Sequence, residues 1–196
     1  MKNSVSIVLS GVGGQGVITA ANILGKAALN ANISVYVSEV HGMAQRGGSV
    51  ICTVRMGNVS TALLASGTAD AFISLEPVEA LRYINFANKE TKVITDIHPT
   101  IPFTVTVSGE KYPKLDDIFN EIEKYAKLYK IDALKIALKS GGIITKNIVM
   151  LGALASSKVL PFSSDVLLKT ILENIPKKYV EMNKQAFMEG FKALKS

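Results

Sequence analysis

The sequence predicts an α/β fold of the doubly wound type, with a mostly parallel sheet and a helical C-terminal part. Three observations support this prediction. Short apolar segments alternate with helical patterns in the N-terminal half, a glycine-rich turn follows the first of these segments, and helical periodicity dominates from Leu115 onward. The chain has 196 residues and contains no linker-like stretch, so we expect one domain over residues 1–196.

The first elements are expected to be a strand, a turn, a helix and a second strand. Val5–Leu9 is a short apolar run, typical of a buried parallel strand. Small and apolar residues recur at helical spacing over Val17–Ala31, and alternation over Ile33–Val40 indicates the second strand. Together they predict a Rossmann-like βαβ unit with a right-handed crossover.

The next elements alternate in the same way. Two strands are predicted over Ser49–Met56 and Ala71–Leu75, and Pro77 is suited to the first position of a helix that reaches about Asn88. Residues 91–97 form another apolar run. We expect a buried strand there and a short edge strand or hairpin arm over 104–113. The remaining helical patterns cover residues 116–129, 133–139, 146–160, 164–174 and 177–194.

The composition favours a protein that buries part of its surface against a partner. Hydrophobic residues make up 48% of the chain, charged residues make up 19%, and the mean hydropathy is +0.28. No apolar run approaches the roughly 18–20 residues that span a bilayer. The apolar N-terminal stretch ends in a glycine loop and not in a cleavage site. We therefore expect a cytoplasmic protein that does not enter the membrane.

The charge pattern does not favour nucleic-acid binding. The net charge is +6, and the whole excess lies in residues 111–196, where lysines and glutamates alternate at helical spacing. This spacing indicates a solvated helix face, and the clusters of arginine and aromatic residues typical of nucleic-acid interfaces are missing.

The residue inventory argues against a resident metal or a complete catalytic centre. Cys52 is the single cysteine, so the chain cannot hold an iron–sulfur cluster by itself, and Cys52 is predicted to be buried. The two histidines lack metal-ligand spacing. The sequence has no nucleophile elbow and no "GDG" motif of the kind that holds thiamine diphosphate. We expect no metal and no catalytic residue in this chain alone.

A glycine-rich loop is the first candidate site. "GVGGQG", residues 11–16, fits G-x-G-x-x-G between a strand and a helix, where bare backbone and a helix N-terminus can bind a phosphate. Glu39 follows at the distance where dinucleotide folds place their ribose-binding acid. The glycines are equally consistent with close packing of the strand on the helix. The candidates are Gly11, Gly13, Gly14, Gln15 and Gly16, together with Glu39.

A second polar loop follows the second predicted strand, in "SEVHGMAQRGGSV", residues 38–50. Arg46 precedes Gly47 and Gly48, which offers a guanidinium and open backbone amides to a phosphate or carboxylate. His41 and Gln45 can hydrogen-bond the same ligand or a facing protein. We expect both loops at the carboxyl ends of adjacent strands, where open α/β sheets bind ligands.

Five segments resemble one known family. "GVGGQGVITAANILGKAAL", "SEVHGMAQRGGSV", "SLEPVEALRY", "NIVMLGALA" and "NKQAFMEGF" are similar, in this order from Gly11 to Phe191, to the gamma-type domain of the 2-oxoacid:ferredoxin oxidoreductases. The form "VHGMAQRGGSV" most resembles the members that act on indolepyruvate. Five ordered motifs cover nearly the whole chain.

The resemblance implies a division of labour. In such enzymes a large alpha subunit holds thiamine diphosphate, Mg and [4Fe–4S] clusters, coenzyme A accepts the acyl group, and electrons pass to ferredoxin. This chain would be the cofactor-free partner in a heterodimer or larger complex. By the same resemblance, the loop residues His41, Gln45, Arg46, Gly47 and Gly48 face the partner's active site, and the glycine loop with Asn147 lines a crevice for coenzyme A phosphates.

Two alternatives remain open from the sequence. One is a free-standing NAD(P)-dependent oxidoreductase that uses Gly11–Gly16 and Glu39, and the other is a nucleotide-binding module without catalysis. The first alternative lacks an evident proton-transfer group, because His98 precedes Pro99 in a loop and has no obvious partner.

Overall fold

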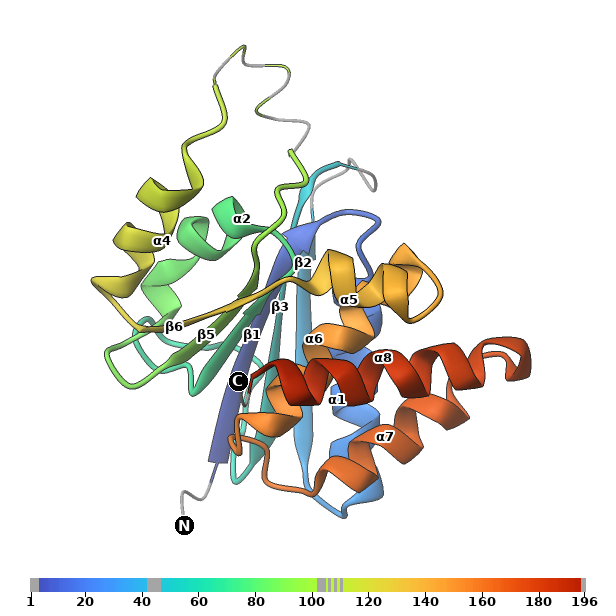
Figure 1. Cartoon of the computed structure of the whole chain (residues 1–196). Coiled ribbons are helices and arrows are strands. Elements are labelled where there is room, and N and C mark those ends of the chain that lie inside the picture. The colour runs from blue at the N-terminus through green and yellow to red at the C-terminus, as the bar shows by residue number, and fades with distance from the viewer. Residues whose placement is uncertain are drawn as a thin grey trace.

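The described residues of this computed structural model form one six-stranded sheet with helices on both faces (Figure 1). The structure describes residues 4–41, 47–101, 105, 107, 109 and 111–194, except for the side chain of His41. The strand order is β2-β3-β1-β4-β5-β6. The strands are β1 (Ser4–Val12), β2 (Val35–His41), β3 (Ser49–Gly57), β4 (Ala71–Ser74), β5 (Lys92–Asp96) and β6 (Lys127–Ile131).

Five of the six strands run in the same direction and β3 alone runs against them, which confirms the predicted mostly parallel sheet. β1 pairs with β4, β4 with β5 and β5 with β6 in parallel, whereas β3 is antiparallel to both β1 and β2. The N-terminal unit therefore differs from the expected one, because β3 lies between β1 and β2. The short connection over residues 42–48 explains why β3 is antiparallel to β2, because parallel neighbours need a longer crossover.

The helices divide into two layers, as expected for a doubly wound fold (Figure 1). α1, α5, α6, α7 and α8 cover one face of the sheet, and α2 and α4 cover the other. The helices are α1 (Val17–Asn30), α2 (Pro77–Arg82), α4 (Leu115–Glu123), α5 (Ala133–Lys139), α6 (Lys146–Ser156), α7 (Ser164–Glu173) and α8 (Val180–Ala193), with 3-10 turns η1 (Ile84–Phe86), η2 (Ile143–Thr145) and η3 (Lys177–Tyr179).

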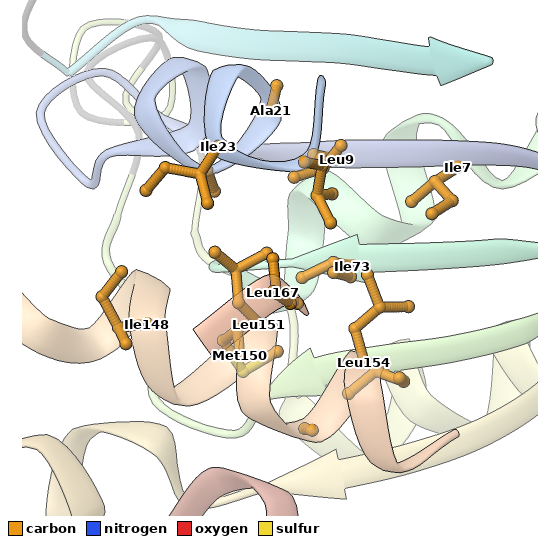
Figure 2. Close-up of a cluster of buried hydrophobic side chains, with 14 of the residues drawn as sticks. Ile7, Leu9, Ala21, Ile23, Ile73, Ile148, Met150, Leu151, Leu154 and Leu167 are labelled. Carbon is orange, nitrogen blue, oxygen red and sulfur yellow. The ribbon is translucent and has the colours of Figure 1, made fainter. Parts of the chain in front are cut away.

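Helix α6 joins the C-terminal part to the sheet. Its side chains meet those of β1 and β4 in the core, where Leu151 and Leu154 lie near Leu9 and Ile73 (Figure 2). All four side chains are almost completely buried. Because an apolar side chain of this size contributes about 1.5–3 kcal/mol on burial, this core fixes α6 against the strands.

Helices α6 and α8 touch backbone to backbone. A Cβ added to Gly152 would lie 2.1 Å from the Phe187 carbonyl oxygen, and one added to Gly190 would lie 2.0 Å from the Val149 carbonyl oxygen. No side chain fits at either position, so both helices need glycine there. Two of the segments that carry the family resemblance thus pack directly against each other.

The helix predicted over 116–129 is wrong in its second half. α4 ends at Glu123, and Lys127–Ile131 form strand β6, which pairs with β5. The local pattern is compatible with a helix, but the ladder to β5 satisfies the backbone and buries Ile131. Tertiary pairing here overrides helix propensity.

Two other predicted helices end earlier in the structure than the sequence indicated. The helix expected over 146–160 ends at Ser156, and the one expected from Pro77 ends at Arg82 and continues as η1. The arm predicted over 104–113 lies partly outside the described residues, and Val105 and Val107 within it are helical instead of extended.

Candidate functional site

The glycine loop lies at the carboxyl edge of the sheet, between the end of β1 at Val12 and the start of α1 at Val17. Gly14 and Gly16 have φ of 100° and 82°, in the left-handed region that favours glycine. Gly16 is the N-cap of α1, and its carbonyl oxygen accepts a hydrogen bond from Asn147 Nδ2 at 3.3 Å. The structure thus brings together Gly16 and Asn147, two of the predicted crevice residues.

Gln15 and Gly11 brace the loop from within. Gln15 Oε1 accepts from the Val12 N–H at 2.8 Å, and Gln15 Nε2 donates to the Leu75 carbonyl oxygen at 3.1 Å. A Cβ added to Gly11 would lie 2.6 Å from Gln15 Oε1. The side-chain amide of Gln15 is therefore engaged in joining the end of β1 to the end of β4.

Gly47 and Gly48 contact the glycine loop through the backbone. Gly13 N–H donates to the Gly48 carbonyl oxygen at 2.8 Å, and Gly47 N–H donates to the Gly13 carbonyl oxygen at 3.2 Å. The two predicted loops therefore do meet, although β3 separates β1 from β2, and the expectation of adjacent strands was wrong. Gln45, Arg46 and the side chain of His41 lie outside the described residues.

Glu39 lies away from this loop. It pairs with Cys52 on β3, and Cys52 pairs in turn with Leu9 on β1. Two strand spacings, about 10 Å, therefore separate Glu39 from β1. In a dinucleotide fold the strand that carries the ribose acid lies next to the first strand, so this sheet order does not favour the ribose role for Glu39.

Two clefts flank the glycine loop. One has a volume of about 400 Å³ and is lined by Val12, Gly13, Gly14, Gly16, Val17, Ile18, Thr19 and Val50. The other has a volume of about 410 Å³ and is lined by Gly14, Gln15, Gly16, Thr19, Thr100, Ile143, Ile144, Lys146 and Asn147. The second cleft, which we call the α6 cleft, lies where the N-terminal ends of α1 and α6 meet, and such ends present free N–H groups that suit an anion.

A buried ion pair forms part of the α6 cleft and was not found from the sequence. Lys146 Nζ lies 2.5 Å from Asp96 Oδ2, and both side chains are buried. The other carboxylate oxygen, Asp96 Oδ1, accepts from the Ala133 N–H at 3.1 Å. One signal was available, because a lysine in the first turn opposes the helix dipole and needs a compensating carboxylate or anion.

His98 has acidic neighbours, contrary to expectation. Its Nδ1 lies 3.5 Å from Asp132 Oδ1 and 3.7 Å from Asp96 Oδ1. Asp132 is also the N-cap of α5, where it accepts from the Lys135 N–H at 3.0 Å. Ionisable side chains therefore form one continuous group at this edge of the sheet, from Lys146 through Asp96 to His98 and Asp132.

Asn147 has an unused acceptor. The residue is 7% exposed, and its Oδ1 has no hydrogen-bond partner among the described residues. A buried acceptor without a partner costs about 1–3 kcal/mol. An N–H or O–H group of a ligand in the α6 cleft would satisfy it.

The described residues show no alternative reactive centre. Burial, with a smaller contribution from Glu39, raises the pKa of Cys52 to about 12, so Cys52 stays a neutral thiol. Within the described ranges no group of three His, Cys, Asp or Glu side chains could hold a metal ion. No helix in that same part of the chain has the length and apolar character needed to cross a bilayer.

Solved structures share this fold. The gamma subunit of the keto/oxoacid ferredoxin oxidoreductase from Geobacter sulfurreducens superposes with a TM-score of 0.71 at 24% identity, covering 97% of this chain and 98% of that one. Subunit PORC of the pyruvate oxidoreductase from Thermotoga maritima gives a TM-score of 0.69 at 21% identity, covering 97% of both chains. These matches support the predicted α/β fold.

Sequence comparisons are more specific. Indolepyruvate oxidoreductase subunit IorB from Thermococcus kodakarensis is 45% identical over 97% of this chain and 96% of its own length, and IorB from Archaeoglobus fulgidus is 42% identical over 95% and 94%. Subunit KorC of the 2-oxoglutarate synthase from Methanocaldococcus jannaschii is 30% identical over 100% of this chain and 96% of its own length. The resemblance inferred from the five segments is therefore confirmed. A family model described as pyruvate ferredoxin/flavodoxin oxidoreductase matches residues 6–193, and the chain belongs to this family.

Proposed function

We propose that this chain is the cofactor-free subunit of a 2-oxoacid:ferredoxin oxidoreductase whose substrate is indolepyruvate or another aryl pyruvate. The observation that carries the proposal is the difference in similarity among relatives. Four IorB subunits are 40–45% identical to this chain, whereas the KorC and PorC subunits are 29–30% identical over similar lengths. The reaction would be oxidative decarboxylation to an acyl-coenzyme A, with electrons passed to ferredoxin.

The redox and carbon chemistry belongs, in this proposal, to a large partner subunit. Cys52 is the single cysteine and is buried as a neutral thiol, so this chain does not fit an iron–sulfur cluster, which needs about four thiolates. The partner would hold thiamine diphosphate, Mg and the [4Fe–4S] clusters. This chain would complete the site that coenzyme A enters.

Coenzyme A phosphates are the proposed ligand of the α6 cleft. Two helix N-termini converge there, and the Lys146 ammonium and the free Asn147 Oδ1 stand beside the glycine loop. Asp96 balances the charge of Lys146, so the N–H groups of α1 and α6 would supply most of the attraction for a phosphate. Asn147 Oδ1 would accept a hydrogen bond from an N–H or O–H of the same ligand.

The partner subunit would cover the carboxyl edge of the sheet. Three large apolar side chains at this edge are each more than half exposed. Ile143 and Ile144 line the α6 cleft, and Ile101 follows Thr100, which also lines it. Exposed large apolar side chains around a polar cleft are typical of an interface. His41, Gln45, Arg46, Gly47 and Gly48 would face the partner's active site, because Gly47 and Gly48 adjoin the glycine loop.

The test is to isolate the tagged chain from its native extract and assay the purified complex. We expect a large subunit with thiamine diphosphate and iron–sulfur absorption, and coenzyme A-dependent dye reduction with a higher kcat/KM for indolepyruvate than for pyruvate or 2-oxoglutarate. Preference for pyruvate or 2-oxoglutarate would refute the substrate assignment. A chain that has no such partner but binds NAD(P)H would restore the Rossmann-type oxidoreductase or nucleotide-module alternative.

Arg46→Ala tests the role of the polar loop in the same complex. We expect lower turnover with the melting temperature unchanged, because the guanidinium would contact the partner or the substrate and not the core. Unchanged turnover would contradict the interface role of this loop.

A further inference from the structure

Two glutamates of the segment "SLEPVEALRY" are fully buried next to the glycine loop but do not line the α6 cleft. Glu76 follows the end of β4, and Glu79 lies in the first turn of α2; both are 0% exposed. Burying a carboxylate is costly unless it is well hydrogen-bonded, and two of them three residues apart repel each other. The hydrogen bonds that compensate this cost indicate the structural role of the two carboxylates.

Glu76 binds one residue that is distant in sequence and caps the helix that follows it. Its Oε1 accepts from the Tyr112 hydroxyl at 2.6 Å, and its Oε2 accepts from the Glu79 N–H at 2.9 Å. Burial raises the pKa of the Glu76 carboxyl, and the hydrogen bond from Tyr112 partly opposes this shift. Glu76 directly follows Leu75, whose carbonyl oxygen accepts the hydrogen bond from Gln15.

Glu79 reaches the other side of the loop. Its Oε2 accepts a short hydrogen bond from Ser49 Oγ, and its Oε1 accepts from Arg82 Nε at 3.0 Å. Ser49 also lies 2.9 Å from the Tyr83 hydroxyl. Ser49 is the first residue of β3 and directly follows Gly48, which contacts Gly13 in the glycine loop.

The segment that carries the two glutamates thus contacts the glycine loop from two sides: the Glu79 carboxylate holds Ser49, and the Glu76 carboxylate caps α2 directly after Leu75. One support runs from Glu79 through Ser49 to Gly48 and Gly13, and the other runs from the Glu76 peptide through Leu75 to Gln15. An apolar pair of similar size would pack α2 at a lower desolvation cost but could not accept the Ser49 hydroxyl or the Tyr112 hydroxyl. This polar network lies beside the glycine loop and not in the centre of the apolar core.

We infer that Glu76 and Glu79 are positioning residues for the ligand of the glycine loop: they fix the ends of β3 and β4, and through them the geometry of Gly13 and Gln15. The inference rests on the proposed function for the identity of that ligand, coenzyme A. Neither glutamate touches the ligand. Losing one support therefore weakens binding more than it slows turnover of the bound complex.

The experiment compares Ser49→Ala, Glu79→Gln and the double variant in the purified two-subunit complex. We expect each single variant to raise the KM for coenzyme A about three- to tenfold with kcat within about twofold, because one charge-assisted hydrogen bond is lost outside the reacting centre. The double variant should be no worse than the more affected single variant, because both act through the same link. Glu79→Asp, which keeps the charge, should recover part of the loss if its carboxylate reaches Ser49.

Glu90→Gln is the matched control, because Glu90 is exposed and pairs only with a surface lysine, Lys127, at 2.5 Å among the contacts described. It should leave the KM unchanged. A correctly folded Ser49→Ala complex with wild-type KM, or fully additive effects in the double variant, would overturn the inference.

Amide hydrogen exchange separates this inference from the proposed function. Ser49→Ala and Glu79→Gln should speed the exchange of the Gly13 amide, which donates to Gly48, without changing exchange in α8. If the wild-type complex does not use coenzyme A, the proposed function fails while the exchange data still decide the inference. Unchanged exchange at Gly13 would overturn it in either case.

Discussion

Replacing Gly16 with alanine tests the contact between the glycine loop and α6. The new Cβ would lie 2.7 Å from Asn147 Nδ2 and 3.2 Å from Asn147 Cγ, and φ of 82° is unfavourable for alanine. We assign about 1–2 kcal/mol to the left-handed backbone. Displacing the buried Asn147 side chain and its hydrogen bond to Gly16 adds about 1 kcal/mol. The free energy of unfolding should therefore fall by about 2–3 kcal/mol.

Gly14→Ala is the matched control. Gly14 has φ of 100°, but a Cβ there would meet nothing within 4 Å, so only the backbone cost applies. The assay is urea denaturation of both variants, and the difference between them should be about 1 kcal/mol. Truncating Asn147 to alanine should abolish that difference, since the clash partner is gone. Equal destabilisation of Gly14→Ala and Gly16→Ala would refute the reasoning.

Three further predictions concern buried titratable groups. Lys146→Met leaves the Asp96 carboxylate buried without its cation and should lower the free energy of unfolding by about 3–5 kcal/mol. Adding Asp96→Asn to this variant should recover part of the loss in the same denaturation assay. Cys52 should react with a thiol reagent at pH 8 only after unfolding, because its pKa of about 12 and its burial suppress the thiolate; rapid labelling of the native chain would contradict this. Folding raises the pKa of the Glu76 carboxyl, so its contribution to stability is fully present below the unfolded pKa near 4.5 and is lost as the pH rises through the folded pKa. The melting temperature should therefore fall with pH over this range, and Glu76→Gln should flatten that fall. An identical slope in the variant would count against the prediction.

The sequence allowed most of the fold to be predicted, because the decisive signals were local. The apolar run of β1, the glycine turn and the helical period of α1 are each visible within a few residues. The start of α1 at Val17 was confirmed, whereas β1 runs on to Val12, three residues beyond the predicted end. Strand β6 was missed because its extended form depends on pairing with β5. In this pairing Lys127 lies opposite Lys92, which is 35 residues earlier in the sequence. The position of β3 between β1 and β2 likewise depends on its pairing with β1, which is distant in sequence, and not on any local pattern.

The site was predicted only in part, for the same reason. The meeting of Gly16 with Asn147 and of Gly13 with Gly48 agrees with the residues singled out in the sequence. Asp96 and Lys146 were not singled out, because their pairing joins a strand end and a helix start that are 50 positions apart. Charges that are compensated across the fold leave only a weak trace in the sequence, in this case a lysine at a helix N-terminus.

The glycine contact between α6 and α8 has a consequence for how the α6 cleft responds to a ligand. With carbonyl oxygens about 2 Å from where any methyl group would sit, α6 cannot slide or roll along α8 without a backbone collision. Lys146 and Asn147 are therefore carried on a rigid wall whose orientation is set before any ligand arrives. If coenzyme A binds there as proposed, adjustment to it would come from the opposite wall, and the energetic cost of ordering α6 would be incurred once, during folding.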